Sequence, residues 1–389
     1  MSPSESRESV SLTGLMAYFL RLGTFGFGGP IALAGRMDRD LVEKRSWVSR
    51  QDYSEGLAFS QLSPGPLAAQ LAMYIGWLKA GRRGALLVSV AFICPSFLMA
   101  VGIAAVYVKF GSLPWIQDLF YGVGAAVIAI IGQSAYRLTR KTIGKDRFLW
   151  VLFVIVAATT VWTGTEMVWL FVLCGVLRVL VKYPLRFVAR STLNSAMPSI
   201  GWLVAGIHGP ASLSTIATLS WFFVKAGAFV FGSGLAIVPF LYGGVVGEFH
   251  WLSERQFLDA IAVAMITPGP VVITAAFIGY LIAGVVGGSL AAAAVFAPPF
   301  VIVAVAAPYY RRFAGNPQVK AFVQGVTAAA VGAIAGAAVI LARRALVDLV
   351  GVALALGVFA VLWKAKKIPE PVVIIFAGVV GLLLHRSGS

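Results

Sequence analysis

FLRLGTFGFGGP (residues 19–30) and FVKAGAFVFGSG (residues 223–234) are two versions of one sequence motif and lie 204 positions apart. In this alignment Arg21 corresponds to Lys225 and Gly23 to Gly227, and the match continues until SPGP (residues 63–66) meets TPGP (residues 267–270). Thirteen of the 48 ungapped pairs over this stretch are identical. The chain therefore contains an internal duplication, and a duplication of this length defines the architecture.

The duplication extends through the rest of the chain after one deletion, which changes the offset to 203. Pro95 then meets Pro298, and Gly122 meets Gly325. We therefore predict two homologous membrane modules, residues 13–182 and residues 214–385. A basic linker, residues 183–213, joins them.

Composition indicates a membrane solvent for both modules. Of the 389 residues, 59% are hydrophobic and only 12% are charged, whereas soluble domains carry about a quarter of charged residues. An uncharged run such as residues 84–108 is long enough to cross a hydrocarbon core of about 30 Å. Comparable runs cover residues 119–136, 148–164, 167–177, 214–246, 257–286, 287–307, 321–342, 346–363 and 371–384. The predicted fold class is an all-α polytopic membrane protein.

The net charge of +16 does not indicate nucleic-acid binding, because the basic residues form short clusters between apolar runs, as in residues 79–83 and 137–147. Lysine and arginine in such loops mark the cytoplasmic side of a membrane protein. The two cysteines lie in apolar runs, and the three histidines are scattered, so no disulfide framework, metal site or cofactor is expected. The chain has no phosphate-binding GxxxxGK[ST] motif and no catalytic constellation, so we expect neither an ATP-driven pump nor an enzyme.

Matched loops carry opposite charge bias, which predicts inverted repeats. Residues 36–50 contain five lysines and arginines and their counterparts, residues 240–254, none, whereas residues 109–118 contain one and residues 311–320 three. Positive loops stay inside, so matched loops lie on opposite sides. The pair formed by residues 137–147 and 343–348 does not follow this trend. We predict about ten transmembrane helices plus two discontinuous segments broken at the Pro-Gly motifs.

The Pro-Gly motifs predict helix breaks at matched positions. A proline lacks an N–H and disfavours helix in the residue before it, so neither motif continues a helix. Such breaks at membrane depth line a cavity or are buried in protein, and inverted repeats with broken helices are typical of secondary transporters. The helix that starts after each break points free N–H groups at an anion. The candidate binding residues are Ser63, Pro64, Gly65, Pro66, Thr267, Pro268, Gly269 and Pro270; the alternative is a pair of packing kinks.

Two basic residues lie near these breaks in the alignment. Arg21 and Lys225 stand in apolar segments, where a charge is costly and is usually functional or paired. The alternative is that both side chains reach the membrane surface from a helix end. The glycines that follow, Gly28, Gly29 and Gly232, would let the backbone approach a ligand closely.

A matched acidic pair completes the candidate site. Glu55 and Asp259 each precede their Pro-Gly motif by about two helical turns. A carboxyl group in an apolar setting holds a proton near neutral pH more readily than one in water, so we assign both to proton coupling. The alternative is a carboxylate at a helix start in contact with water. One shared site requires Arg21, Lys225, Glu55 and Asp259 to converge on one cavity at the middle of the membrane.

FGFGGP with SPGP in one half, and FVFGSG with TPGP in the other, resemble the long two-repeat form of the chromate ion transporter family. The resemblance covers residues 15–384 and implies multi-pass insertion in the inner (plasma) membrane, with chromate and the lipid bilayer as partners. It further implies chromate export from the cytoplasm, driven by the membrane potential, by antiport with protons or by both, and chromate resistance. Gly234 stands where the first repeat has Pro30, so the two halves of the site are not identical.

Other functions remain open at this point. Sulfate and other oxyanions share the shape and charge of chromate, so a transporter of one of these is the nearest alternative. A channel does not require broken helices at matched positions, and a membrane-embedded enzyme requires a polar catalytic cluster that the sequence lacks. A homodimer is compatible with the sequence, as is a monomer.

Overall fold

The structure is a computed structural model. It describes residues 10–27, 29–111, 113–163, 168–183, 213–228, 230, 234–310, 316–346, 348–365 and 368–384. Within these ranges the protein is entirely helical. The glycines Gly28 and Gly232 of the candidate site lie outside the described residues, as does most of the predicted basic linker.

The first repeat begins with short helices and ends with longer ones. Its elements are α1 (Leu12–Phe25), α2 (Gly29–Met37), a π-helical turn η1 (Asp38–Lys44), α3 (Arg50–Leu62), α4 (Leu67–Phe110), α5 (Pro114–Ile143), α6 (Arg147–Thr163) and α7 (Val168–Lys182).

The second repeat follows the same order, so each element has a counterpart. Its elements are α8 (Leu213–Ala228), η2 (Gly234–Ile237), α9 (Val238–Tyr242), η3 (Gly243–Glu248), α10 (Glu254–Ile266), η4 (Val271–Ile273), α11 (Thr274–Ala306), η5 (Ala307–Tyr309), α13 (Pro317–Ala345), α14 (Leu349–Lys364) and α15 (Glu370–Leu384).

Matched local signals set the matched boundaries. Ser49 and Ser253 cap the starts of α3 and α10 by accepting backbone hydrogen bonds from Asp52 and Gln256. Serine is a favoured N-cap because its hydroxyl satisfies one of the free N–H groups of the first turn. The predicted Pro-Gly breaks then end both helices: α3 stops at Leu62 and α10 at Ile266.

Both repeats contain a second helix break, which the Pro-Gly motifs do not predict. Inside α4, Ala80 and Gly81 leave the helical conformation, with Gly81 at φ 57° and ψ −144°; inside α11, Ala283 and Gly284 do the same, with Gly284 at φ 60° and ψ −153°. This conformation is open to glycine and strained for other residues. Each long helix therefore consists of a short arm and a long arm that fold back on each other.

Glycines let the two arms pack without side chains between them. A side chain at Gly76 would overlap the carbonyl of Gly84, and one at Gly279 would overlap that of Gly287. The short arm of α4, residues 67–79, also packs back against α3, where Tyr74 contacts Gly56 and Phe59. The helix α3 and this arm thus form a hairpin of two short helices around residues 63–66.

Four helices among the described residues are long and apolar enough to cross a membrane: Leu67–Phe110, Pro114–Arg140, Val271–Tyr309 and Pro317–Ala345. The helices Arg147–Thr163, Leu349–Lys364 and Glu370–Leu384 are apolar but shorter. Apolar side chains such as Leu98, Trp162 and Phe376 are exposed on the outside of the bundle, as a surface in contact with lipid requires. The expected run over residues 214–246 is interrupted after α8, and the predicted count of ten crossings stays a prediction.

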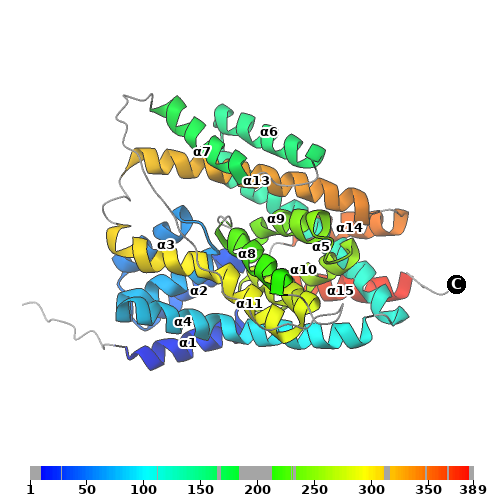
Figure 1. The fold of residues 1–389 in the computed structure, drawn as a ribbon, viewed down its shortest axis with the longest axis horizontal. Helices are drawn as coiled ribbons and strands as arrows, with labels where there is room; N and C mark the ends of the chain where they lie inside the picture. The colour runs from blue at the N-terminus through cyan, green and yellow to red at the C-terminus, as the bar shows by residue number, and fades with distance from the viewer. Residues whose placement is uncertain are drawn as a thin grey trace, which may run out of the picture.

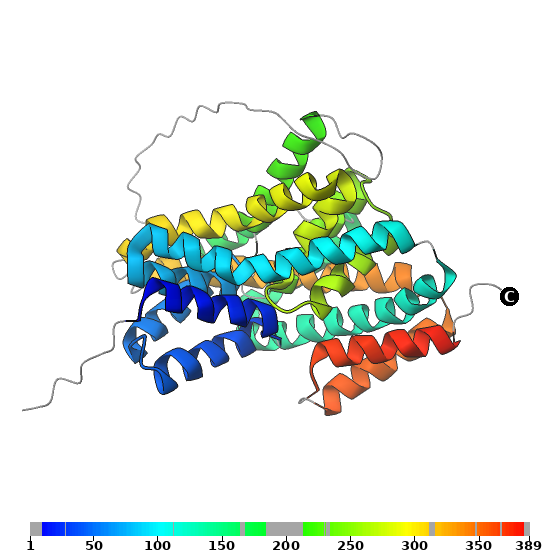
Figure 2. The same ribbon diagram turned by 90° about the horizontal axis from the view of Figure 1, so that it is seen from below.

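The long helices of the two repeats run in opposite directions. In Figures 1 and 2 the colours of α4 run from blue to cyan in one direction along the bundle, and those of α11 run back along it. Val101 in the last third of α4 accordingly lies beside Gly288 in the first half of α11. The helices α5 and α13 also pack against each other.

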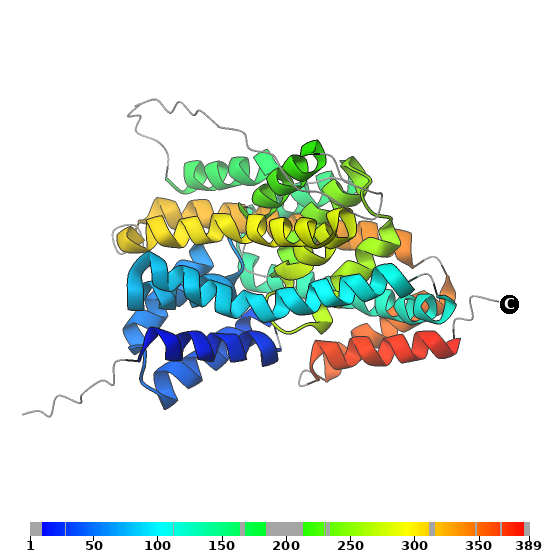
Figure 3. The same cartoon turned by 60° about the horizontal axis from the view of Figure 1, so that its bottom comes forward.

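The last two helices of each repeat pack on the other repeat. Helices α6 and α7 lie on α13, whereas α14 and α15 lie on α5, which is visible in Figures 1 and 3. The same exchange occurs in both directions, so each repeat is covered by the last helices of the other. The repeats are therefore interlocked. A large apolar core contains residues of both repeats, and a smaller one lies where α6 and α7 pack on α13.

Candidate functional site

Four helix breaks meet where the two repeats contact each other. The N–H of Gly65, in the first Pro-Gly motif, donates to the carbonyl of Val230 at 2.5 Å, just after α8. The N–H of Gly269, in the second motif, donates to the carbonyl of Gly26 at 3.0 Å, just after α1. Gly65 aligns with Gly269 and Gly26 with Val230, so the two hydrogen bonds join corresponding residues of the two repeats. Each Pro-Gly motif is therefore held by the Gly-rich break of the other repeat.

The two motif glycines adopt conformations that need glycine. Gly65 has φ 138° and Gly269 has φ 100°, a region that L-residues with side chains rarely enter. A Cβ at Gly65 would lie 2.7 Å from the Cβ of Pro299, and one at Gly269 would overlap the hydroxyl of Ser96. Backbone of one repeat thus approaches the other repeat without room for a methyl group.

Side chains satisfy the carbonyls that the breaks expose. Gln70 donates through Nε2 to the carbonyl of Pro64 at 2.6 Å, and Ser96 donates through Oγ to the carbonyl of Pro268 at 2.7 Å. Gln70 and Ser96 are fully buried. Within the described chain, the second polar atom of Gln70, Oε1, is buried without a hydrogen-bond partner. A buried acceptor of this kind calls for a donor, such as water or a hydroxyl group of a ligand.

Helix starts with no side-chain cap follow both motifs. Pro66 and Pro270 occupy the N-cap positions of α4 and η4, and neither makes a side-chain cap. Two helix starts come together in the second repeat, because a Cβ on Gly234, the first residue of η2, would lie 3.6 Å from the nitrogen of Val271. Converging helix N-termini favour an anion through their N–H groups and partial positive charge.

The predicted hydroxyl ligands are used within their own helices. Ser63 donates to the carbonyl of Phe59 at 2.8 Å, and Thr267 donates to that of Ala264 at 3.2 Å. Both side chains are buried. In this conformation each hydroxyl offers an incoming ligand its oxygen lone pairs, and its proton is already committed.

The basic residues take different positions. Arg21, on the last turns of α1, is exposed, and Lys225, on the last turn of α8, is half-buried. A third basic side chain, Arg36 of α2, reaches the first break, where it donates to the carbonyl of Phe25 at 3.1 Å. Sequence comparison does not single out Arg36, because Phe240 stands at the matching position of the second repeat.

Asp259 is the most deeply enclosed of the predicted charged residues. Its side chain on α10 is only 3% exposed. Its Oδ2 accepts a hydrogen bond of 2.6 Å from the hydroxyl of Tyr107, which lies near the end of α4 in the other repeat. The carboxyl group of Asp259 is thus held by a donor from the other repeat.

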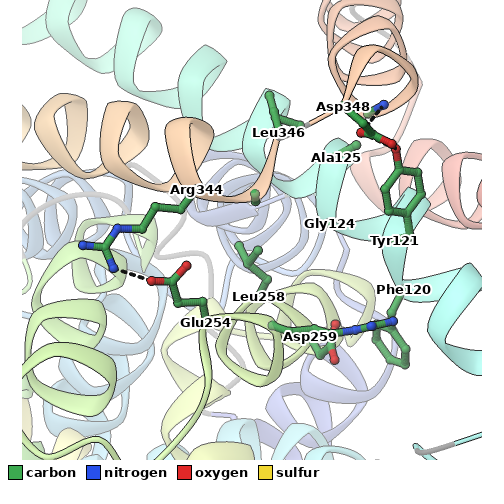
Figure 4. Close-up of a pocket in the computed structure, with 13 residues that line it drawn as sticks. Phe120, Tyr121, Gly124, Ala125, Glu254, Leu258, Asp259, Arg344, Leu346 and Asp348 are labelled. Carbon is green, nitrogen blue, oxygen red and sulfur yellow. Dashed lines mark hydrogen bonds and ion pairs between the residues drawn. The ribbon is translucent and has the colours of Figure 1, made fainter.

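Asp259 borders a cavity of about 400 Å³ between α5, α10, α13 and the start of α14 (Figure 4). Charged residues dominate its polar lining. Arg344 pairs with Glu254, and Tyr121 donates to Asp348 at 2.6 Å. Arg255 also lines the cavity and donates to the backbone carbonyl of Gln117 at 2.8 Å.

The predicted charged residues do not share this cavity. Its lining includes Asp259 but not Glu55, Arg21 or Lys225. Glu55 is half-buried on α3 and accepts a hydrogen bond of 3.1 Å from Gln51. One turn further along α3, the ring of Phe59 packs edge-on against that of Tyr310, beyond the end of α11, with centroids 5.3 Å apart. Because α4 and α11 are antiparallel, the two carboxylates lie toward opposite ends of the molecule, and the expected convergence of four charges is not what the structure shows.

The residues missed from sequence share one signal. Tyr107 and Tyr310 are counterparts at the offset of 203, as are the turns at residues 80–81 and 283–284. A matched aromatic residue and a matched Ala-Gly pair are weak signals in an apolar chain. They gain meaning only when the contacts between repeats are known.

Comparison with known proteins agrees with the duplication. The family model described as "Chromate transporter" matches the chain twice, over residues 13–179 and 217–382. The chain is 52% identical over 385 residues to the "Chromate transport protein" of Cupriavidus metallidurans, covering 97% of this chain and 94% of that protein. It is also 52% identical over 379 residues to the "Probable chromate transport protein" of Synechococcus elongatus, covering 96% of each.

A more distant relative extends the similarity. The chain is 29% identical over 397 residues to the "Chromate transport protein" of Pseudomonas aeruginosa, covering 97% of this chain and 94% of that protein. No solved structure matches the chain. The two matches to one family model and the full-length relatives lead to one conclusion: the chain belongs to the chromate transporter family.

Proposed function

We propose that this protein exports chromate from the cytoplasm across the inner membrane and thereby confers chromate resistance. The observation that carries the proposal is the reciprocal pair of hydrogen bonds between Gly65 and Val230 and between Gly269 and Gly26. It joins four helix breaks into one centre, in a chain that belongs to a family of transporters. Two long relatives with 52% identity bear names that assign chromate transport to them.

The central breaks form the proposed substrate site. Helix starts without side-chain caps at Leu67 and Val271 offer backbone N–H groups to the oxygens of a tetrahedral anion. The unpartnered Oε1 of Gln70 accepts a hydrogen bond from a hydrated or protonated anion. Arg21 and Lys225 supply positive charge along the approach to this site.

The proposed orientation is that of inverted repeats. The antiparallel course of α4 and α11 supports it, with the membrane normal along these long helices. Residues 13–182 and 214–385 then form two modules of opposite orientation. Such a pair can open the central site to one side of the membrane at a time.

Energetics favour export without ATP. A membrane potential of about 100 mV, negative inside, is worth about 2.3 kcal/mol per elementary charge, so a dianion gains about 4.6 kcal/mol on leaving. Inward proton movement in exchange would add to this drive. We assign that role to Glu55 and Asp259, one near each end of the molecule.

Uptake of radiolabelled chromate into inside-out membrane vesicles tests the proposal, with sulfate as competitor and the pH gradient present or absent. Saturable uptake that the gradient stimulates supports proton-coupled export. Uptake driven by the potential alone supports export and removes the proton role of the carboxylates. Uptake of sulfate without chromate would replace the substrate with another oxyanion, the runner-up function.

Substitution of the basic residues sharpens the same assay. Arg21→Ala and Lys225→Ala should each abolish chromate uptake while the protein remains in the membrane at normal amount. Arg82→Ala, in the exposed turn region of α4, is the matched control for loss of a positive charge and should retain uptake. Normal uptake in both central variants would eliminate Arg21 and Lys225 as ligands.

A further inference from the structure

Two tyrosine–carboxylate pairs lie at corresponding positions in the duplicated chain, and both cross the repeat boundary. Tyr107 of the first repeat faces Asp259 of the second. At the matching positions stand Tyr310 of the second repeat and Glu55 of the first. The ring of Tyr310 packs edge-on against Phe59, one turn beyond Glu55, with the ring centroids 5.3 Å apart.

The two pairs differ in how closed they are. Asp259 is 3% exposed and its hydrogen bond to Tyr107 measures 2.6 Å. Glu55 is half-buried. The residues one position earlier differ in the same sense, because Leu258 is buried and its counterpart Ser54 is exposed. The carboxylate of one pair is therefore enclosed by protein, and that of the other is partly exposed.

In the closed pair, the ring of Tyr107 is packed between other aromatic rings. The ring of Tyr107 contacts the rings of Phe120 and Phe277, both with centroids 5.6 Å away. A second cavity, of about 340 Å³, is lined by Tyr107, Gln117 and Arg255 but not by Asp259. Asp259 borders the larger cavity described above.

We propose that Tyr107 and Tyr310 are alternating latches: each holds the carboxylate of the other repeat in the state in which its own end of the transporter is closed. In the present state Tyr107 holds Asp259, and the Glu55 end is open. In the opposite state Tyr310 donates to Glu55, and the Asp259 end opens. The inference rests on the proposed transport function and adds two positioning residues to it.

The physical basis is the exchange of one hydrogen bond for its counterpart. A hydrogen bond to a charged group is among the stronger single contacts in a protein. Because the two bonds are equivalent by the duplication, making one while breaking the other changes the total energy little. Two states of similar energy are what alternating access requires.

The test uses thiol labelling of the full chain in lipid nanodiscs, where both faces are open to reagent. In a Cys94→Ala/Cys174→Ala background, a single reporter is introduced as Leu258→Cys or as Ser54→Cys. Each reporter precedes one carboxylate by one residue. The rate of reaction with a hydrophilic maleimide then measures how open each end is, with no substrate present.

Removal of one hydroxyl should move the two reporters in opposite directions. Tyr107→Phe should raise the labelling rate at position 258 and lower it at position 54, by up to about tenfold for one hydrogen bond to a charged group. Tyr310→Phe should do the reverse. The double variant Tyr107→Phe/Tyr310→Phe should return both rates toward those of the parent, because it weakens both states equally.

Tyr121→Phe provides a matched control. It removes a hydroxyl that also donates to a carboxylate, Asp348, in the same cavity, but the counterpart of Tyr121 is Gln324. Labelling at position 54 should not change in this variant. Equal responses to Tyr121→Phe and Tyr107→Phe, parallel changes at both reporters, or no change in any variant would overturn the latch. A failure of chromate transport with reciprocal labelling would overturn the substrate assignment instead.

Discussion

The centre of the molecule keeps the symmetry of the duplication, and the two ends do not. At the centre, Gly65 and Gly269 make equivalent hydrogen bonds to equivalent carbonyls. At the ends, the equivalent residues Asp259 and Glu55 differ, one buried under a tyrosine and the other half-exposed. The contrast separates a rigid part, where two repeats lock together, from parts that can exist in two arrangements. A transporter needs a rigid part and parts that move, because its binding site opens to one side of the membrane at a time.

Substitution of the central glycines should have the largest effect. Gly269→Ala introduces a methyl group that overlaps Ser96, at a backbone φ of 100°. Strain of about 1–3 kcal/mol for the backbone alone, added to the overlap, should displace the motif and reduce transport to background. Gly65→Ala should do the same. Radiolabelled chromate uptake, normalised to protein amount, measures it.

Gly102→Ala is the control for that experiment, since a side chain at this position in α4 meets open space. It should retain transport. Normal transport in Gly65→Ala and Gly269→Ala would mean that the breaks serve packing alone and that the symmetric centre is not the site.

Substitution of the carboxylates tests whether the asymmetric ends carry the coupling. Asp259→Asn keeps an oxygen that accepts from Tyr107 and removes the proton-binding group. We expect transport that no longer responds to a pH gradient but still responds to membrane potential, and the same for Glu55→Gln. Uptake with each gradient imposed separately measures this. Undiminished stimulation by the pH gradient in both variants would contradict the assignment.

The last two helices of each repeat differ between the repeats in one ion pair. Arg178 of α7 pairs with Asp146 before α6, whereas Leu349 stands at the matching position of the second repeat. Burial acts to raise the pKa of Asp146, but hydrogen bonds from the backbone N–H groups of Leu149 and Phe148 and the contact with Arg178 outweigh it and lower the pKa.

Asp146→Ala should therefore destabilise the protein by about 1–3 kcal/mol, a value reduced because the carboxylate is partly exposed. The lowered pKa means that this stabilisation is present above the usual range of an aspartate and is lost as the pH falls through the folded-state value. Thermal unfolding in detergent at neutral and acid pH measures both effects. The cost of the substitution should shrink at acid pH, and an equal cost at both would contradict the pairing.

The smallest effect is expected at Cys94. Its counterpart in the second repeat is Ala297, and both line a groove between α4 and α11. Cys94→Ala makes the groove more symmetric and should change stability by less than about 0.5 kcal/mol, with transport retained. Thermal unfolding and uptake check it, and a large loss in either would show that Cys94 has a role its counterpart lacks.

The prediction from sequence succeeded where a local rule acts on a few adjacent residues. The Pro-Gly motifs end α3 and α10 because proline cannot continue a helix. The helix breaks after α1 and α8 were harder to predict, because a glycine-rich stretch allows a helix to end but does not require it to. The turn at Ala80 and Gly81 could not be predicted for the same reason.

Contacts between the repeats could not be predicted from the sequence. The hydrogen bond from Tyr107 to Asp259 joins residues 152 positions apart, and the local sequence around either residue does not indicate the other as its partner. The packing of α6 and α7 on α13 likewise depends on how the repeats interlock. Arg36 carries no signal in the duplication, because Phe240 stands at the matching position of the second repeat.

The central claim is that the substrate binds at the symmetric centre and not in the charged cavity at one end. Electron cryomicroscopy of the full chain in nanodiscs with chromate tests it directly, because chromium scatters more strongly than the atoms of the protein. The account predicts tetrahedral density between the helix starts that follow residues 63–66 and 267–270, absent without chromate. Density instead between Arg255 and Arg344, with an unchanged centre, would contradict it.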